Sequence, residues 1–242
     1  MQTIVITGAN KGIGFALAQK LGELGNTIIL TARKNSEGQK ALSELKSAGI
    51  NCYFFKMDVI LSEEIEATAA AINQQFGKID VLINNAGMMH PEEGWIGNST
   101  LTVREKALTK TFLTNFIGPW KVSKAFVPLL ELSEAGQIVN VSAKIASLTL
   151  ASDKKNPVYN SKPFAYNASK GALNQLTVHL AHALRRQKIK VVSIYPGWVQ
   201  TDMGGEKATY TPLQAAQQIS EIILNSAVVS GTFLDFEHEL PW

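Results

Sequence analysis

The sequence has 242 residues, of which 45% are hydrophobic and 18% charged, and its formal net charge is +3. This composition excludes a largely disordered chain, and no apolar run is long enough to cross a bilayer. The lysines and arginines are dispersed, which argues against a nucleic-acid surface. A strand-like segment begins at Thr3, so we expect no signal peptide, and the single cysteine, Cys52, cannot form an internal disulfide. We therefore expect a cytoplasmic protein whose partners include neither nucleic acid nor a membrane.

Short runs rich in β-branched residues alternate with stretches of helical length along the chain. Strands are expected at residues 3–7, 27–31, 52–57, 81–84, 137–142, 191–195 and 231–236, and helices at residues 12–24, 37–48, 63–76 and 165–187. This alternation predicts an α/β fold in which helices cover both faces of a doubly wound parallel sheet of seven strands. We expect one domain spanning residues 1–242. The least regular stretches, residues 90–100, 148–163 and 198–212, are expected as loops after strands, where such sheets bind ligands.

A glycine-rich turn, TGANKGIG at residues 7–14, follows the first expected strand and opens the first expected helix. Glycine permits positive φ in a tight turn and lets the backbone approach a pyrophosphate closely. The start of the helix offers unpaired N–H groups and the positive end of the helix dipole to the phosphates. A turn without a ligand is the alternative, but the position at the start of a β-α-β unit favours a dinucleotide. The expected contacts in this turn are Gly8, Asn10, Lys11, Gly12, Ile13 and Gly14.

The end of the second expected strand indicates which dinucleotide is bound. An NAD site usually has Asp or Glu about 20 residues beyond the glycines, where it binds the ribose 2′-hydroxyl. Here no acid lies between Glu23 and Glu37, and Arg33 stands at the strand end. The guanidinium of Arg33 can bind a 2′-phosphate, with Lys11 adding a second positive charge. Ordinary solvated loop charges are the alternative, but the missing acid favours NADP(H) as the cofactor.

Tyr166 and Lys170 are four residues apart, so they share one face of a helix, although such a pair alone is a weak signal. Other motifs accompany it: residues 84–87 read Asn-Asn-Ala-Gly after the fourth expected strand, and Ser142 ends the fifth. With these motifs in this order along the sequence, the chain resembles the short-chain dehydrogenase/reductase family over nearly its whole length. Residues 7–14 match the TGxxxGxG turn of that family and residues 84–87 its NNAG motif. Its catalytic tetrad is matched by Asn115, Ser142, Tyr166 and Lys170.

The resemblance implies a Rossmann fold and extends the expected cofactor site beyond the glycine turn and Arg33. Asp58 matches an acid that lies near the adenine in the family, and Pro196-Gly197 with Thr201 match the segment that meets the nicotinamide. Asn84 is also expected to tie neighbouring strands together through its amide. The further expected cofactor contacts are Asp58, Val59, Asn84, Ala86, Gly87, Tyr166, Lys170, Pro196, Gly197, Val199 and Thr201.

The same resemblance implies a mechanism in which a carbonyl receives a hydride from the nicotinamide and a proton from Tyr166. A free tyrosine has a pKa of about 10, and we expect the Lys170 ammonium, and NADP⁺ in the oxidised complex, to lower it. The Ser142 hydroxyl would orient and polarise the substrate oxygen. Lys170 would also hold the nicotinamide ribose, and Asn115 would hold a water that links Lys170 to solvent.

Two features favour a carbonyl reductase of aldehydes, ketones or quinones within this family: residues 30–33 and the C-terminal segment both resemble that group. The 3-oxoacyl-acyl-carrier-protein reductases share the catalytic set, but their closing TGQ…DGG pattern is absent. The spacing between Ser142 and Tyr166 is also longer than is usual for them. An NADP-binding sensor without catalysis is the alternative from another class, and the intact Ser142, Tyr166 and Lys170 argue against it.

Methionines and aromatic residues in the loops after the strands suit a broad apolar carbonyl substrate. Besides Ser142 and Tyr166, the expected substrate contacts are Met88, Met89, Trp95, Phe164, Trp198 and Met203. Ordinary packing is the alternative for each. Three of the four histidines show no ligand spacing, and His238 stands between two glutamates that need not converge on a metal, so we expect no metal. The polar insertion around residues 151–162 leaves a monomer, a homodimer and a homotetramer all open.

Overall fold

A parallel sheet of seven strands forms the centre of the molecule, and the computed structural model describes all residues, 1–242. The strands are β1 (Thr3–Ile6), β2 (Thr27–Ala32), β3 (Cys52–Lys56), β4 (Val81–Asn84), β6 (Gln137–Val141), β8 (Lys190–Ile194) and β9 (Phe233–Leu234). Their order across the sheet is β3-β2-β1-β4-β6-β8-β9. The chain runs outward from β1 to β3 and returns to β4 on the other side of β1. The expected fold class is confirmed, and β1 and β4 meet where the strand order reverses.

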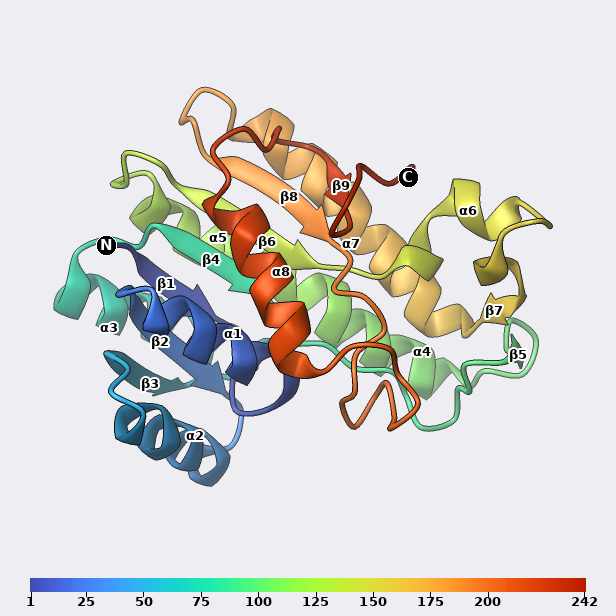
Figure 1. The fold of residues 1–242 in the computed structure, drawn as a ribbon, viewed down its shortest axis with the longest axis horizontal. Helices are drawn as coiled ribbons and strands as arrows, with labels where there is room; N and C mark the ends of the chain where they lie inside the picture. The colour runs from blue at the N-terminus through green and yellow to red at the C-terminus, as the bar shows by residue number, and fades with distance from the viewer.

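Helices cover both faces of this sheet (Figure 1). On one face lie α1 (Gly12–Glu23), α2 (Asn35–Ser47) and α8 (Pro212–Leu224), with α1 and α8 side by side. On the other lie α3 (Ser62–Phe76), α5 (Gly118–Leu130) and α7 (Phe164–Ala183). The shorter α4 (Glu105–Phe112) packs against α7. The arrangement is that of a doubly wound sheet.

Successive residues of each central strand contribute to two separate cores. Ile4 and Ile6 pack with Leu17 of α1, whereas Val5 packs with Phe126 of α5, and all five side chains are fully buried. Side chains alternate between the faces of a strand, so a strand covered on both faces must be apolar at nearly every position. This is why β1 and β4 appear in the sequence as uninterrupted apolar runs.

Two of the three stretches expected as loops contain regular structure. The residues between β6 and α7 form α6 (Leu148–Ser152), a 3₁₀ turn η3 (Pro157–Asn160) and a short strand β7 (Ser161–Lys162). β7 pairs in parallel with β5 (Gly97–Asn98), so two distant segments meet in a second small sheet. Figure 1 shows this group at one end of the molecule. The prediction of loops at residues 90–100 and 148–163 is therefore wrong for these parts. The two-residue strands β5 and β7 exist only because distant segments pair, so no local periodicity reveals them.

The helix that carries the predicted catalytic pair begins at Phe164 and ends at Ala183, close to the predicted range. The last strand is shorter than predicted and covers only Phe233–Leu234. None of the helices combines the length and the apolar character that crossing a membrane would require.

Candidate active site

Tyr166 and Lys170 lie on one face of α7 and point into the molecule. Their exposed fractions are 7% and 4%, and the Lys170 Nζ stands 5.9 Å from the centroid of the Tyr166 ring. Lys170 donates a hydrogen bond of 2.6 Å to the carbonyl oxygen of Val141, the last residue of β6. Because Ser142 follows directly, this bond fixes the lysine beside the predicted serine.

Ser142 is held at the end of β6 by both its backbone and its side chain. Its N–H donates to the carbonyl of Ile194 at 2.8 Å, which continues the pairing of β6 with β8. Its Oγ donates to Oδ1 of Asn174 at 2.6 Å, and both residues are buried. Asn174 was not predicted as a site residue. Its position, one turn beyond Lys170 and two beyond Tyr166, was a signal that could have identified it.

Asn115 lies in a π-helical turn, η1 (Leu113–Ile117), between α4 and α5, and it is fully buried. Its Oδ1 accepts a hydrogen bond from the N–H of Met88 at 2.8 Å, and its Nδ2 donates to the carbonyl of Met88 at 2.7 Å. A third bond of 3.0 Å runs from Nδ2 to the Oγ of Ser169, next to Lys170. π-helical turns occur frequently at functional sites.

Gly87 lies beside Asn115 and Lys170. A Cβ added at Gly87 would stand 3.4 Å from both the Oδ1 of Asn115 and the Nζ of Lys170. The backbone after β4 therefore passes directly beside the two side chains. The structure thus brings all four members of the predicted tetrad to the carboxyl ends of β4 and β6. The roles assigned to them remain predictions.

Burial shifts the pKa of the two ionisable groups of the tetrad in opposite directions. Loss of solvation lowers the pKa of Lys170 from 10.5 to about 8. The same cause, followed by a smaller contribution from Tyr195, raises the pKa of Tyr166 above its usual 10. Desolvation of the phenolate, and not the charge of Lys170, therefore dominates the pKa of Tyr166. The phenol stays protonated at neutral pH, which is the form that can donate a proton.

The glycine turn after β1 has the shape of a phosphate cradle. Gly8 and Gly12 have φ values of +64° and +59°, which glycine adopts without strain. A Cβ at Gly14 would lie 2.4 Å from the Nδ2 of Asn85 and 2.7 Å from the carbonyl oxygen of Gly8. No side chain caps the start of α1, so its first N–H groups can bind an anion.

The two asparagines at the end of β4, Asn84 and Asn85, have different roles. Asn84 is 2% exposed, and its Nδ2 donates to Oδ1 of Asn140 on β6 at 2.9 Å and to Oγ of Ser123 on α5 at 3.1 Å. It ties the neighbouring strands together, as its amide was expected to do. Asn85, which was not among the predicted contacts, donates to the carbonyls of Thr7 and Gly8 at 2.9 and 3.1 Å. Asn85 therefore holds the glycine turn in place.

The residues expected at the 2′-phosphate lie on the surface. Arg33 is exposed at the end of β2. Lys11 forms an ion pair with Asp202, so it reaches toward the loop after β8. Glu37 accepts hydrogen bonds from Nδ2 of Asn10 at 2.9 Å and from Nζ of Lys34 at 2.8 Å. The hydrogen bond from Lys34 holds the pKa of Glu37 below its usual value. The sequence provided no sign that this acid would fold back to the glycine turn.

The remaining predicted cofactor contacts line the same edge of the sheet. Asp58 follows β3, and its Oδ1 accepts a hydrogen bond from the N–H of Ile60 at 3.2 Å. Val59 is buried against Gly118 at the start of α5. After β8, Gly197 has a φ of +77°, and the Thr201 methyl would stand 3.3 Å from a Cβ on Gly12. Thr201 therefore lies directly against the glycine turn. The other predicted cofactor contacts in the segments that follow β4 and β8 are Ala86, Pro196 and Val199.

Among the predicted substrate contacts, Trp95 packs against Tyr166, and Met203 accepts a hydrogen bond from Trp95. The Trp95 ring meets the Tyr166 ring edge to face with centroids 5.7 Å apart, and its Nε1 donates to the carbonyl of Met203 at 3.0 Å. Met88 is fixed through its backbone to Asn115. Trp198 is 42% exposed and donates to the carbonyl of Gly204 at 2.9 Å. Met89 and Phe164 are half-buried.

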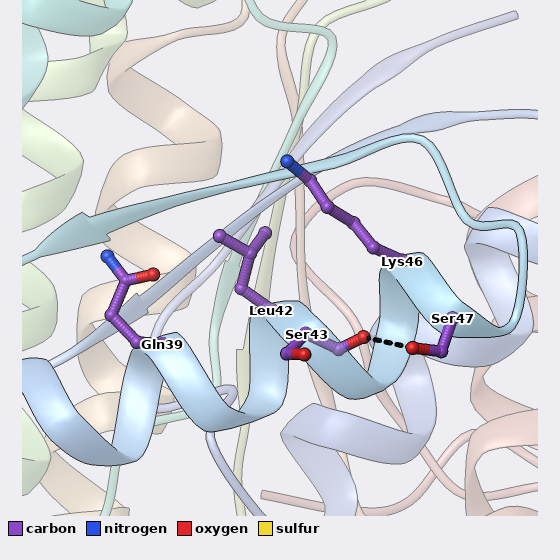
Figure 2. A pocket seen from close by; sticks show the side chains of 5 residues that line it. All are labelled: Gln39, Leu42, Ser43, Lys46 and Ser47. Atoms are coloured by element: carbon purple, nitrogen blue, oxygen red, sulfur yellow. Dashed lines mark hydrogen bonds between the residues drawn. The ribbon is translucent and has the colours of Figure 1, made fainter.

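A shallow hollow of about 410 Å³ lies elsewhere, along α2 at the β3 edge of the sheet (Figure 2). Four of the five residues around it are polar, and it contains none of the predicted catalytic groups. Its lining consists of Gln39, Leu42, Ser43, Lys46 and Ser47. The hollow therefore has no part in the site described above.

The model of the short chain dehydrogenase family matches residues 2–211. This chain belongs to that family. It is accordingly an oxidoreductase, and the resemblance seen in its motifs is confirmed. Carbonyl reductase (NADPH) 1 from Sus scrofa is 31% identical, in an alignment covering 88% of this chain and 83% of the relative.

Solved structures of two carbonyl reductases superpose closely on this short-chain dehydrogenase. The NADPH-bound enzyme from chicken fatty liver has a TM-score of 0.86 at 27% identity, with 100% of this chain and 99% of the other covered. The carbonyl reductase Sniffer of D. melanogaster has a TM-score of 0.87 at 30% identity, with both chains fully covered, 100% each. Both comparisons support the same fold over the entire length.

Proposed function

We propose that this protein is an NADPH-dependent carbonyl reductase that converts an aldehyde, ketone or quinone to an alcohol. One observation carries the proposal: Ser142, Tyr166 and Lys170 converge at the end of β6, on the same edge of the sheet as the glycine turn. A hydroxyl, a protonated phenol and a lysine at this place form a proton-donating site next to a dinucleotide site.

The residues after β1 fit a dinucleotide. Glycine at residue 14 lets the turn pack closely, because a Cβ there would clash with the Gly8 carbonyl and the Asn85 amide, and the uncapped start of α1 offers N–H donors to a pyrophosphate. Arg33 at the end of β2, where an NAD site has an acid, supports NADP(H) over NAD. The NADPH in the names of the related carbonyl reductases supports the same choice. When bound, the reduced nicotinamide supplies a hydride to the carbonyl carbon.

The side chains of this chain then control the substrate oxygen. Tyr166, whose pKa is raised by burial, donates its hydroxyl proton to the oxygen as negative charge develops there. Ser142 can turn its hydroxyl from Asn174 to the same oxygen and stabilise that charge. Lys170, held by the Val141 carbonyl, places positive charge beside the Tyr166 ring and favours the phenolate left after proton transfer.

The apolar ring of Trp95 against Tyr166 supports an apolar carbonyl substrate. The decisive experiment mixes the purified protein with NADPH and a panel of aldehydes, diketones, quinones and β-ketoacyl thioesters, and follows nucleotide oxidation by absorbance. Turnover of the free carbonyls with little turnover of the thioesters is the expected result. Preference for the thioesters would favour a carrier-protein reductase instead. Tight NADPH binding without any turnover would favour a sensor and contradict the proposal.

A further inference from the structure

The start of α7, the helix that carries Tyr166 and Lys170, is capped by a distant loop. Its N-cap residue is Pro163, which provides no side-chain cap. The N–H of Phe164 donates to the Oγ of Ser99 at 2.8 Å. The N–H of Ala165 donates to Oε1 of Glu93 at 2.8 Å, and that of Tyr166 to Oε2 at 3.1 Å. Three otherwise unpaired donors are thus satisfied from the segment after β4.

Glu93 is an unusual residue for a loop because it is almost completely buried, with an exposed fraction of 4%. Burial of a carboxylate is costly unless hydrogen bonds compensate for the lost water. Here two backbone N–H groups and the Ser99 hydroxyl, at 2.8 Å from Oε1, supply three such bonds. The negative charge also lies at the positive end of the dipole of α7. The site is therefore built for a carboxylate.

The same loop contacts Tyr166 a second time. Trp95, two residues after Glu93, packs edge to face against the Tyr166 ring, and its Nε1 is tied to the Met203 carbonyl. Glu93 thus holds the backbone of Tyr166 while Trp95 contacts its ring. The adjacent Glu92, by contrast, is exposed and forms an ion pair with Arg104.

We propose that Glu93 is a positioning residue that caps α7 and fixes the Tyr166 hydroxyl in its reactive place relative to Ser142. The proposal rests on the proposed carbonyl reduction, in which Tyr166 is the proton donor. Proton transfer depends on hydrogen-bond geometry, and a displacement of about 1 Å can cost a large factor in rate. Glu93 binds the backbone N–H of Tyr166 and not its hydroxyl, so it acts on the rate through Tyr166.

The test compares Glu93→Gln and Glu93→Ala with Glu92→Gln as the matched control. Glutamine keeps the size of the side chain but replaces one acceptor oxygen with a donor, so one of the two N–H bonds is lost. We expect kcat to fall about tenfold in Glu93→Gln and further in Glu93→Ala. The KM for NADPH should stay within about twofold, because the glycine turn is untouched. Glu92→Gln should match the wild type.

Fluorine NMR of protein labelled with fluorotyrosine gives a readout that does not depend on turnover. The resonance of Tyr166, one of five tyrosines, is identified as the one missing in Tyr166→Phe. It should move in both Glu93 variants and stay in place in Glu92→Gln. An unmoved resonance in Glu93→Gln would overturn the proposal. A moved resonance with unchanged kcat would also overturn it, because the cap would then be structural only. If the wild type reduced no carbonyl, the proposed function would fail, and the resonance would still report whether Glu93 positions Tyr166.

Discussion

The two ends of the site differ in how their side chains are held. At the end of β6, Ser142 and Lys170 are buried and hydrogen-bonded to the protein itself. At the end of β2, the charged groups are on the surface, and the ion pair of Lys34 with Glu37 joins side chains that are 60% and 41% exposed. Buried hydrogen-bonded groups keep their positions, whereas exposed ion pairs add little stability and exchange partners easily. Under the proposed function, the reaction geometry is thus built into the core, whereas cofactor preference would depend on surface charges that rearrange easily.

The largest effect is expected from Tyr166→Phe, which removes only the hydroxyl at the buried end. Without the proton donor, kcat should fall about 1,000-fold, within the range for general acid catalysis. The dissociation constant for NADPH should change little, because the glycine turn and Arg33 are unaffected. Stopped-flow turnover and fluorescence titration of NADPH measure the two quantities. Retained turnover would contradict the assignment of Tyr166 as the acid.

The burial of Lys170 predicts a pH-dependent stability. Its pKa is about 8 in the folded protein against 10.5 when exposed, so between these values the unfolded chain binds more protons. Stability should therefore rise with pH in this window. Relative to Lys170→Met, the wild type should gain up to ~3 kcal/mol of unfolding free energy from pH 8 to 10.5. Urea denaturation at several pH values measures it, with the exposed Lys106→Met as control. If the unfolding free energies of the wild type and of Lys170→Met changed in the same way with pH, the Lys170 ammonium would not be desolvated.

At the exposed end, Arg33→Ala should weaken NADPH binding about tenfold, the size of one charge-assisted hydrogen bond. NADH lacks the 2′-phosphate, so its binding should be unchanged. Isothermal titration with both nucleotides gives the comparison. Lys46→Ala is the control, because it removes one positive charge from the far end of α2. An equal loss for NADPH and NADH would defeat the assignment of Arg33 to the 2′-phosphate.

The smallest effect is expected from Trp198→Ala, because Trp198 is half exposed and bonds within its own loop. The ratio of kcat/KM between a bulky and a small carbonyl should change about fivefold, as is typical for altered apolar contacts. Trp120→Ala, an equally exposed tryptophan on α5, should leave the ratio as it is. If Trp198→Ala also left it unchanged, Trp198 would lie outside the substrate pocket.

Sequence reasoning succeeded where neighbouring residues carry the information. The apolar runs predicted β1 and β4, and the spacing of glycines predicted the turn at residues 7–14, because both depend on local backbone requirements. It did not find Asn174 or Glu93, whose partners are 32 and 72 or more residues away. It also expected Lys170 to lower the pKa of Tyr166. The opposite direction follows from burial, which no local pattern reveals.

The sequence by itself determined the sheet and the glycine turn, since these depend on residue type and short spacing, and its resemblance to the family predicted the tetrad. Only the tertiary structure decided that Asn85 rather than Asn84 holds the turn, that Asn174 binds Ser142, and that an acid from a remote loop caps α7. The physical reason is that hydrogen bonds between distant segments, and the degree of burial that shifts a pKa, exist only once the chain has packed.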